Sequence, residues 1–315
     1  MEKLKAGVLE LDRLILGAGR LGEEEKKDAC FAILDRYLEL GFCTLDVARS
    51  YCNGKCEEFL GEYLKKRDRN KVTIISKGGF PLSRKEMYKT RLSEKELRKD
   101  LEASLKALGT EYIDLYFLHR DRPDVPPEEM LYPLNQFILE GKVREIGASN
   151  WSCGRIDAAN RFAETNGLRP FAVSQINYSY ALTTPPLTGD ITHITMNNIE
   201  YHWYRENAFP LIAYSVQAKG FFTKYFSGDE LKESGKLSYL PLKENFRRAE
   251  RIRELSLQKS VPIPALLISY VLSKEIPAAA IGGFSNTKQL EESLPGVQLR
   301  LTKQEIQFLE GEYLA

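Results

Sequence analysis

The sequence lacks an excess of charge of either sign. Its 315 residues carry 45 Lys and Arg against 44 Asp and Glu, a formal net charge of +1. This balance gives no general attraction to nucleic-acid phosphates or anionic membranes. There is also no apolar run near the ~20 residues that span a bilayer, and no N-terminal signal-peptide pattern. We therefore expect a globular, cytoplasmic protein with no nucleic-acid or membrane partner.

Cysteine is scarce and is not arranged in metal-binding pairs. The five cysteines include no C-x-x-C pair, and their odd number favours reduced thiols over a disulfide framework. Cys52 and Cys56 bracket a short loop, but no second pair or nearby histidine completes four zinc ligands. No H-E-x-x-H motif or carboxylate cluster indicates a catalytic metal. The sequence therefore predicts no metal site.

No linker rich in Pro, Gly or Ser divides the chain. Short β-branched or apolar runs alternate with segments of helical period throughout, which predicts one domain over residues 1–315. The apolar runs occupy residues 13–16, 42–45, 72–76, 112–118, 143–148, 172–176, 211–214 and 278–281. Eight strand-helix units predict an α/β fold of the (β/α)8 TIM barrel type, with an additional C-terminal helix from about Thr302.

The segments between these runs predict the helices of the barrel. We expect helices at 23–40, from about 57, at 94–108, 128–140, from 152, at 242–258 and at 287–293. Ser93 and Glu96 have the spacing of a capping box. A long irregular connection runs to residue 199, and an insertion occupies about 221–241.

Polar side chains stand where the apolar runs end. In a (β/α)8 barrel the chemistry lies at the C-terminal ends of the strands. Asp46, Lys77 and His119 end three successive runs, so we expect them to share one mouth. Later runs end in Ser149 and Asn150, Gln175 and Asn177, Tyr214 and Ser215, and Gly282 and Gly283. Each residue alone has a plain explanation as the start of a loop.

The types of residue at these strand ends limit the reactions that a site there could catalyse. No Ser or Cys in an elbow context supports acyl transfer. Tyr51 lies on the loop that leaves the second run, and a phenol, with a pKa of about 10, needs a neighbouring cation to work near neutral pH. Lys77 could supply that cation, Asp46 could pair with Lys77, and His119 could orient a substrate oxygen. Spacing alone leaves open that Tyr51 is instead an aromatic of the core or of the rim.

Several blocks of the sequence resemble the aldo-keto reductase family. D-V-A-R-S-Y-C-N-G-K-C-E-E-F-L-G at 46–61 is similar to the family signature. I-D-L-Y-F-L-H-R at 113–120 resembles its histidine strand, and G-K-V-R-E-I-G-A-S-N-W at 141–151 resembles its Ser-Asn strand. The A-Y-S of 213–215 and the G-G-F-S-N-T-K-Q-L-E-E-S of 282–293 follow in matching order, so the resemblance covers nearly the whole chain.

The resemblance implies a barrel that binds NAD(P)H and reversibly reduces aldehydes or ketones to alcohols. It makes Tyr51 the proton donor, Asp46 and Lys77 the pair that lowers its pKa, and His119 the residue that orients the carbonyl. It assigns Ser149, Asn150 and Gln175 to the nicotinamide carboxamide, Tyr214 to stacking on the ring and Ser215 to the pyrophosphate side. It assigns the segment from Gly282, with Ser285, Asn286, Gln289 and Glu292, to the adenosine part.

Departures from the family pattern affect the choice of cofactor and substrate. Gly283 and Phe284 stand where many members have a basic residue and a Ser that hold the 2′-phosphate, and Lys288 could offer one charge instead. We therefore expect a modest preference for NADPH, with NADH as the alternative. Substrate-pocket candidates are Arg20 and Trp151, with the loops 81–90, 120–124 and 221–241.

Two other functions are compatible with parts of the pattern. A cofactor-binding regulatory subunit resembling potassium-channel beta subunits would retain the same four residues, but no unusual surface run or long N-terminal extension suggests a docking element. An unrelated barrel enzyme of phosphorylated metabolites would leave Asp46, Tyr51, Lys77 and His119 without a role. The sequence thus favours an enzyme that acts on a small-molecule carbonyl, and it leaves open a homo-oligomer, the substrate and the direction of the reaction.

Overall fold

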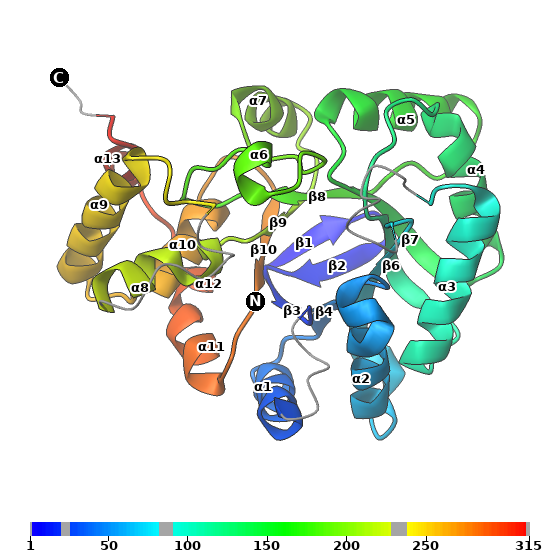
Figure 1. Ribbon diagram of the computed structural model, residues 1–315, viewed down its shortest axis with the longest axis horizontal. Coiled ribbons are helices and arrows are strands. Elements are labelled where there is room, and N and C mark those ends of the chain that lie inside the picture. The colour runs from blue at the N-terminus through cyan, green and yellow to red at the C-terminus, as the bar shows by residue number, and fades with distance from the viewer. Residues whose placement is uncertain (1, 20–25, 82–90, 228–237, 313–315) are drawn as a thin grey trace.

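Eight parallel strands close into a barrel, as predicted. The computed structural model describes residues 2–19, 26–81, 91–227 and 238–312. The strands follow one another around the barrel in the order β10-β3-β4-β5-β6-β7-β8-β9. Their bounds are β3 Leu14–Gly17, β4 Thr44–Asp46, β5 Thr73–Gly78, β6 Ile113–Leu118, β7 Val143–Ser149, β8 Val173–Asn177, β9 Leu211–Tyr214 and β10 Ala278–Gly282. Figure 1 shows helices surrounding this barrel, which confirms the (β/α)8 fold.

The helices largely follow the predicted segments. They are α1 Lys27–Glu39, α2 Lys55–Leu64, α3 Glu94–Leu108, α4 Pro127–Leu139, α5 Cys153–Thr165, α6 Pro185–Thr188, α7 Asn198–Glu206, α8 Phe221–Ser227, α9 Glu244–Lys259, α10 Ile263–Leu272, α11 Thr287–Ser293, α12 Pro295–Gln298 and α13 Lys303–Glu310. The 3-10 turns among the described residues include η2 Tyr51–Gly54, η3 Arg69–Lys71 and η5 Ala218–Gly220. The capping box of Ser93 and Glu96 is present at the start of α3.

Helix α10 is an element that the sequence pattern did not predict. Its residues IPALLISYVL are almost all apolar, and Ala265 to Leu272 are all buried. A helix covered on every side has no polar face, so it shows no amphipathic period. It packs against β10 and against α8, α9, α11 and α12.

An unpredicted hairpin closes the N-terminal end of the barrel. Strands β1 (Lys3–Ala6) and β2 (Leu9–Asp12) pair antiparallel, and Figure 1 shows them lying across the centre of the ring. Their apolar side chains pack on residues that fill the barrel interior, namely Leu4, Ala6, Leu9 and Leu11 against Ile15, Ile75, Leu115, Phe117, Val173, Ile212 and Ala279. The opposite, C-terminal end is therefore the end where a site can open.

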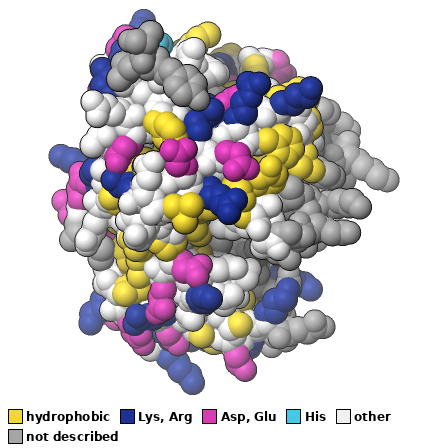
Figure 2. Space-filling model, turned by 90° about the vertical axis from the view of Figure 1, so that its left-hand side faces the viewer, with side chains coloured by type: hydrophobic (Ala, Val, Ile, Leu, Met, Phe, Trp, Pro, Cys, Tyr) yellow, Lys and Arg dark blue, Asp and Glu magenta, His cyan; other side chains and the backbone are white. Residues whose placement is uncertain are grey.

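The surface carries both signs of charge side by side. Figure 2 shows the face over α8, α9 and α13, where Lys and Arg alternate with Asp and Glu around smaller apolar areas. This mixture fits the formal net charge of +1. In the part of the chain that the structure describes, no single helix has the length and hydropathy to cross a membrane; only α9 and α10 taken together, across a 101° bend, reach both.

Candidate active site

A cleft of about 1030 Å³ opens at the C-terminal end of the barrel. Residues from the ends of most strands line it. The predicted ones are Asp46, Tyr51, His119, Ser149, Asn150, Gln175, Tyr214, Ser215, Ser285, Gln289 and Glu292. The structure therefore brings most of the predicted residues to one site.

Lys77 lies beneath this cleft with its charge fully enclosed by protein. Its side chain has no exposed surface, and its Nζ donates to Asp46 Oδ2 at 2.8 Å and to the Val47 carbonyl at 2.9 Å. Burial alone would lower the pKa of Lys77, but the Asp46 carboxylate and the Tyr51 hydroxyl outweigh it, so the pKa lies above its ordinary value. Lys77 is therefore an ammonium at neutral pH.

Tyr51 directs its hydroxyl toward that ammonium. The Tyr51 hydroxyl oxygen lies 3.3 Å from Lys77 Nζ. Burial raises the pKa of Tyr51 above its ordinary value; Lys77 opposes this rise, and Asp46 adds to it. Arg120 also lowers the pKa of Tyr51, and Asp46 acts on it indirectly by holding the Lys77 ammonium in place. Tyr51 is consequently a protonated phenol at neutral pH, which is the form that can donate a proton.

His119, the residue that directly follows β6, packs beside Tyr51. Its Nδ1 lies 3.2 Å from Ser50 Oγ, and its ring packs 4.8 Å from the Phe80 ring and 5.7 Å from the Tyr51 ring. Burial, together with the charges of Arg120 and Lys77, holds the pKa of His119 well below its usual range. The imidazole is therefore neutral at neutral pH. If Ser50 donates to Nδ1, the proton lies on Nε2, which can then donate to a substrate oxygen.

The predicted carboxamide-binding residues form their own hydrogen-bond network. Gln175 Nε2 donates to Asp46 Oδ1 at 2.9 Å, which links these predicted carboxamide-binding residues to the Asp46–Lys77 pair. The Tyr214 hydroxyl donates to Asn150 Oδ1 at 2.7 Å, and Asn150 Nδ2 donates to Ser149 Oγ at 3.1 Å. Ser149, Asn150 and Gln175 are nearly fully buried. Their polar groups are thus held in fixed orientations at the cleft wall.

The segment after β10 reaches the cleft only in part. Ser285, Gln289 and Glu292 line it. Asn286 instead caps α11 by accepting from the Gln289 amide at 2.9 Å, and Gly282 packs against Phe284, whose ring would lie 2.5 Å from an added Cβ. Neither is among the described residues that line the cleft: the Asn286 side chain serves the helix end, and Gly282 is the last residue of β10.

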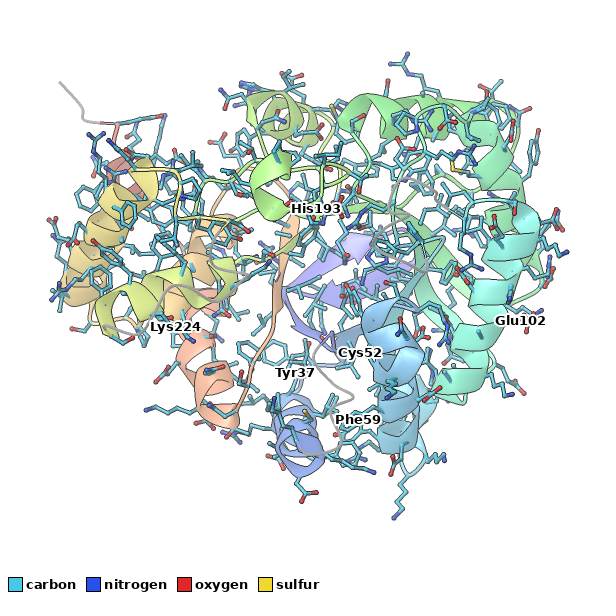
Figure 3. All side chains as sticks on the ribbon, in the orientation of Figure 1. Tyr37, Cys52, Phe59, Glu102, His193 and Lys224 are labelled. Carbon is cyan, nitrogen blue, oxygen red and sulfur yellow. The ribbon has the colours of Figure 1, made fainter. Side chains whose placement is uncertain are left out.

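Two residues outside the predicted segments, Lys219 and His193, also line the cleft, and Lys224 brings the predicted 221–241 segment to it. Lys219 and Lys224 follow β9, and His193 lies on the β8–α7 connection; Figure 3 labels His193 and Lys224. The signal for the lysines was the run A-K-G-F-F-T-K, which places two basic residues directly after the predicted strand end. His193 had no signal, because only the folded connection brings it to the site.

A buried ion pair forms the wall beside His119. The Arg120 guanidinium donates to Asp190 Oδ2 at 3.0 Å, to Thr192 Oγ at 3.0 Å and to the His119 carbonyl at 2.7 Å. Burial and the Arg120 charge lower the pKa of His193 to about 4. Arg120 lines the cleft, so the first residue of the predicted 120–124 substrate loop does reach the site.

Two single residues, Trp151 and Arg20, were predicted for the substrate pocket, and the structure describes only Trp151. Trp151 is completely buried, with its ring 5.3 Å from the Phe171 ring, and it is absent from the described cleft wall. This corrects its assignment: Trp151 comes after the strand end and turns into the layer between barrel and helices. Arg20 lies outside the described residues, as do 82–90 and 228–237 of the predicted loops.

Histidine, cysteine and carboxylate side chains do not gather in threes, as metal ligands would, anywhere in the described ranges. The cleft instead offers hydroxyl, amide and ammonium groups around the protonated phenol of Tyr51. Such a set can bind a polar organic molecule and transfer a proton to it.

The sequence model of the aldo/keto reductase family matches residues 13–312. The chain belongs to the aldo/keto reductase family. It is 27% identical to norsolorinic acid reductase B of Aspergillus parasiticus over 98% of this chain and 82% of that protein. It is 26% identical to versiconal hemiacetal acetate reductase of Aspergillus parasiticus over 97% of this chain and 94% of that protein.

The fold likeness extends to solved members of the family. The thermostable aldo-keto reductase Tm1743, solved with the inhibitor epalrestat, superposes with a TM-score of 0.77 at 22% identity, over 99% of this chain and 100% of that one. As an aldo-keto reductase, the chain is an oxidoreductase that acts on carbonyl groups of small molecules with a nicotinamide cofactor.

Proposed function

We propose that this aldo-keto reductase reduces an aldehyde or ketone to an alcohol with NADPH, NADH being the alternative reductant, and that Tyr51 donates the proton. The observation that carries this proposal is the Tyr51 hydroxyl, 3.3 Å from a fully buried lysine ammonium at the wall of the cleft. A carbonyl oxygen that approaches between Tyr51 and His119 would meet one acid and one neutral imidazole.

The residues of the cleft fit a nicotinamide dinucleotide. Ser149, Asn150 and Gln175 offer the hydroxyl and amide groups that a carboxamide needs, and the ammonium groups of Lys219 and Lys224 suit phosphate oxygens. Apart from its two chain neighbours, no heavy atom of the described residues lies within 4 Å of the place where a Cβ on Gly283 would be, so a ligand can approach that backbone closely. The bound dinucleotide would supply the hydride.

The protein groups supply the proton and control its source. As the carbonyl carbon is reduced, the Tyr51 hydroxyl gives its proton to the developing alkoxide oxygen. The phenolate left behind lies beside the Lys77 ammonium, which Asp46 keeps charged. His119 orients the carbonyl oxygen toward the acid. Such general acid catalysis typically contributes ~10²- to 10⁴-fold to the rate.

The remaining cofactor roles follow from position along the cleft. We assign Tyr214 to the nicotinamide ring, Ser215 to the pyrophosphate side, and Ser285, Gln289 and Glu292 to the adenosine end. Gly282 and Asn286 support that last segment from outside the cleft wall.

Aromatic carbonyl compounds are the first substrates to test. The Tyr51 and His119 rings both line the cleft, with Phe80 packed against His119 behind them, and such an aromatic wall suits a flat ring. One relative, at 27% identity, is named an aryl-alcohol dehydrogenase, from Pestalotiopsis microspora.

The test follows NADPH and NADH oxidation over a panel of aromatic aldehydes, sugar aldehydes and ketones. We expect turnover with at least one carbonyl class, and loss of it in Tyr51→Phe and in Lys77→Met. The double variant should lose far less than the product of the two single losses, because the two groups act as one unit. A wild-type protein that binds NADPH but turns over none of the panel would instead support the regulatory-subunit function.

A further inference from the structure

The turn that carries Tyr51 has an unusual backbone. Cys52, Asn53 and Gly54 adopt φ angles of 49°, 55° and 89°, three successive residues in the left-handed region. For residues other than glycine this conformation costs roughly 1 kcal/mol or more each, so other contacts must hold the turn in place. Within η2, Tyr51 is the residue just before this strained run.

One arginine spans the strained turn from behind. Arg49 Nη1 donates to Glu57 Oε2 at 2.9 Å, so the ion pair joins the loop before Tyr51 to the first turn of α2 after it. A Cβ on Gly54 would lie 2.1 Å from Arg49 Nη1, so only glycine lets the guanidinium lie across the turn. Arg49 and Glu57 therefore hold the two ends of the turn together, and neither is among the described residues that line the cleft.

The same contacts continue to the strand that carries Lys77. Glu57 is completely buried, and its other oxygen accepts from Ser76 Oγ at 2.7 Å. Ser76 directly precedes Lys77 on β5, and the Arg49 amide donates to the Lys77 carbonyl at 3.1 Å. Arg49 thus fixes the Tyr51 turn to β5 through both its backbone and its side chain.

We propose that Arg49, through its ion pair with buried Glu57 and the Glu57–Ser76 hydrogen bond, is a positioning residue that sets the place of the Tyr51 hydroxyl relative to Lys77. None of Arg49, Glu57 and Ser76 belongs to the described cleft wall, so the three act through Tyr51 and not on substrate. The inference rests on the proposed function in so far as Tyr51 is the proton donor.

The chain offers a matched control for loss of a buried ion pair. Arg69 donates to Asp114 Oδ2 at 2.6 Å, and the Arg69 and Asp114 side chains are 18% and 4% exposed, against 26% and 0% for Arg49 and Glu57. Asp114 also accepts from the Ile74 amide on β5, toward the N-terminal end of the strand. Arg69→Met therefore removes the 2.6 Å arginine partner of a buried carboxylate at the far end of the same strand, where Arg144 stays 3.2 Å from Asp114 Oδ1.

The kinetic test compares Arg49→Met with Arg69→Met where both are fully folded. Arg49→Met should lower kcat by roughly 10- to 100-fold, since a displacement of about 1 Å can cost that much. The KM for carbonyl and the Kd for NADPH should stay near wild type, and Arg49→Lys should recover part of kcat. Glu57→Gln, which keeps its link to Ser76, should give a smaller loss and serves if Arg49→Met does not fold.

A second readout needs neither cofactor nor turnover. The ¹³Cζ resonance of Tyr51, assigned with Tyr51→Phe at neutral pH, should move in Arg49→Met or Glu57→Gln and stay in place in Arg69→Met. Equal kcat losses in Arg49→Met and Arg69→Met, or an unmoved Tyr51 resonance, would overturn the proposal. If wild type reduces no carbonyl but the resonance moves, the proposed reaction fails while the positioning of Tyr51 by Arg49 stands.

Discussion

Two clusters of the same three residue types lie at opposite ends of the barrel. At the C-terminal end, Lys77 lies between Asp46 and the Tyr51 hydroxyl. At the N-terminal end, Asp12 lies among Lys3, the Tyr37 hydroxyl at 3.3 Å and the backbone amides of residues 43 and 44. In the first cluster the tyrosine meets the cation, and in the second it meets the carboxylate.

The difference shows why composition alone does not make an active site. Tyr37 is completely buried, and its hydroxyl is close to the Leu14 and Thr44 carbonyls as well, so its proton is already committed. Burial and the Asp12 charge raise the pKa of Tyr37 far above its ordinary value. For Tyr51, the Lys77 cation opposes the rise in pKa, and the side chain faces the cleft. Its hydroxyl can therefore give a proton to a bound molecule and leave a phenolate that Lys77 stabilises.

The sharpest test exchanges the two tyrosines for phenylalanine in turn. Tyr51→Phe should lower kcat by ~10²- to 10⁴-fold at saturating cofactor, because the acid is lost while the ring remains. Tyr37→Phe should leave kcat unchanged and cost about 1 kcal/mol of unfolding free energy, from lost hydrogen bonds. Steady-state kinetics and urea unfolding measure the two effects. Near-native turnover by Tyr51→Phe would remove Tyr51 from the chemistry.

A change in the N-terminal cluster should affect the free energy of unfolding and not catalysis. Asp12→Ala leaves Lys3, the buried amide of Thr44 and the partly buried amide of Cys43 without their acceptor. We expect a loss of ~3–5 kcal/mol in unfolding free energy, the usual cost of removing one partner from a buried pair. The kcat per folded molecule should stay at the wild-type value. A large kcat loss in folded Asp12→Ala would mean that the two ends are not independent.

The pH dependence of reduction should reflect only the C-terminal cluster. Tyr51 must be protonated to act, and its pKa lies above its ordinary value, so the active form persists throughout the neutral range. His119 titrates well below its usual range, so it stays neutral there. We expect a constant kcat between about pH 6 and pH 9, and a fall only at higher pH. A break near pH 6.5 that is absent in His119→Gln would contradict this assignment.

The smallest expected effect belongs to an exposed lysine–carboxylate pair. Lys288 Nζ lies 3.8 Å from Glu292, and the Lys288 side chain is 82% exposed. An exposed charge contributes about 0.2–1 kcal/mol, so Lys288→Ala should change the ratio of the NADPH and NADH dissociation constants by only a few-fold, toward NADH. Calorimetric titration with both cofactors measures the ratio. An unchanged ratio would exclude Lys288 as a contact of the 2′-phosphate.

The sequence was most informative where local chemistry and strand ends coincide. Asp46, Lys77 and His119 could be predicted as one group because parallel strands of a barrel end at the same face. Tyr51 needed the family resemblance, since a loop residue has no fixed direction. The rise of its pKa could not be predicted, because burial of a phenol depends on everything packed around it.

Other features depended on packing that no local pattern records. The hairpin Lys3–Asp12 has short alternating strands with a glycine between, but its role appears only against the barrel interior. Trp151 was misplaced because a side chain just beyond a strand end can turn either to the cleft or to the helix layer. His193 joins the site through a long connection whose path no periodicity indicates.

The hairpin also sets how molecules enter and leave the site. Its side chains fill the N-terminal end of the barrel, so in the described chain the cleft communicates with solvent on the opposite side. Under the proposed function, reductant and carbonyl would therefore both enter from the C-terminal side, and a change at the hairpin would affect the stability of the barrel without opening a second path to the site.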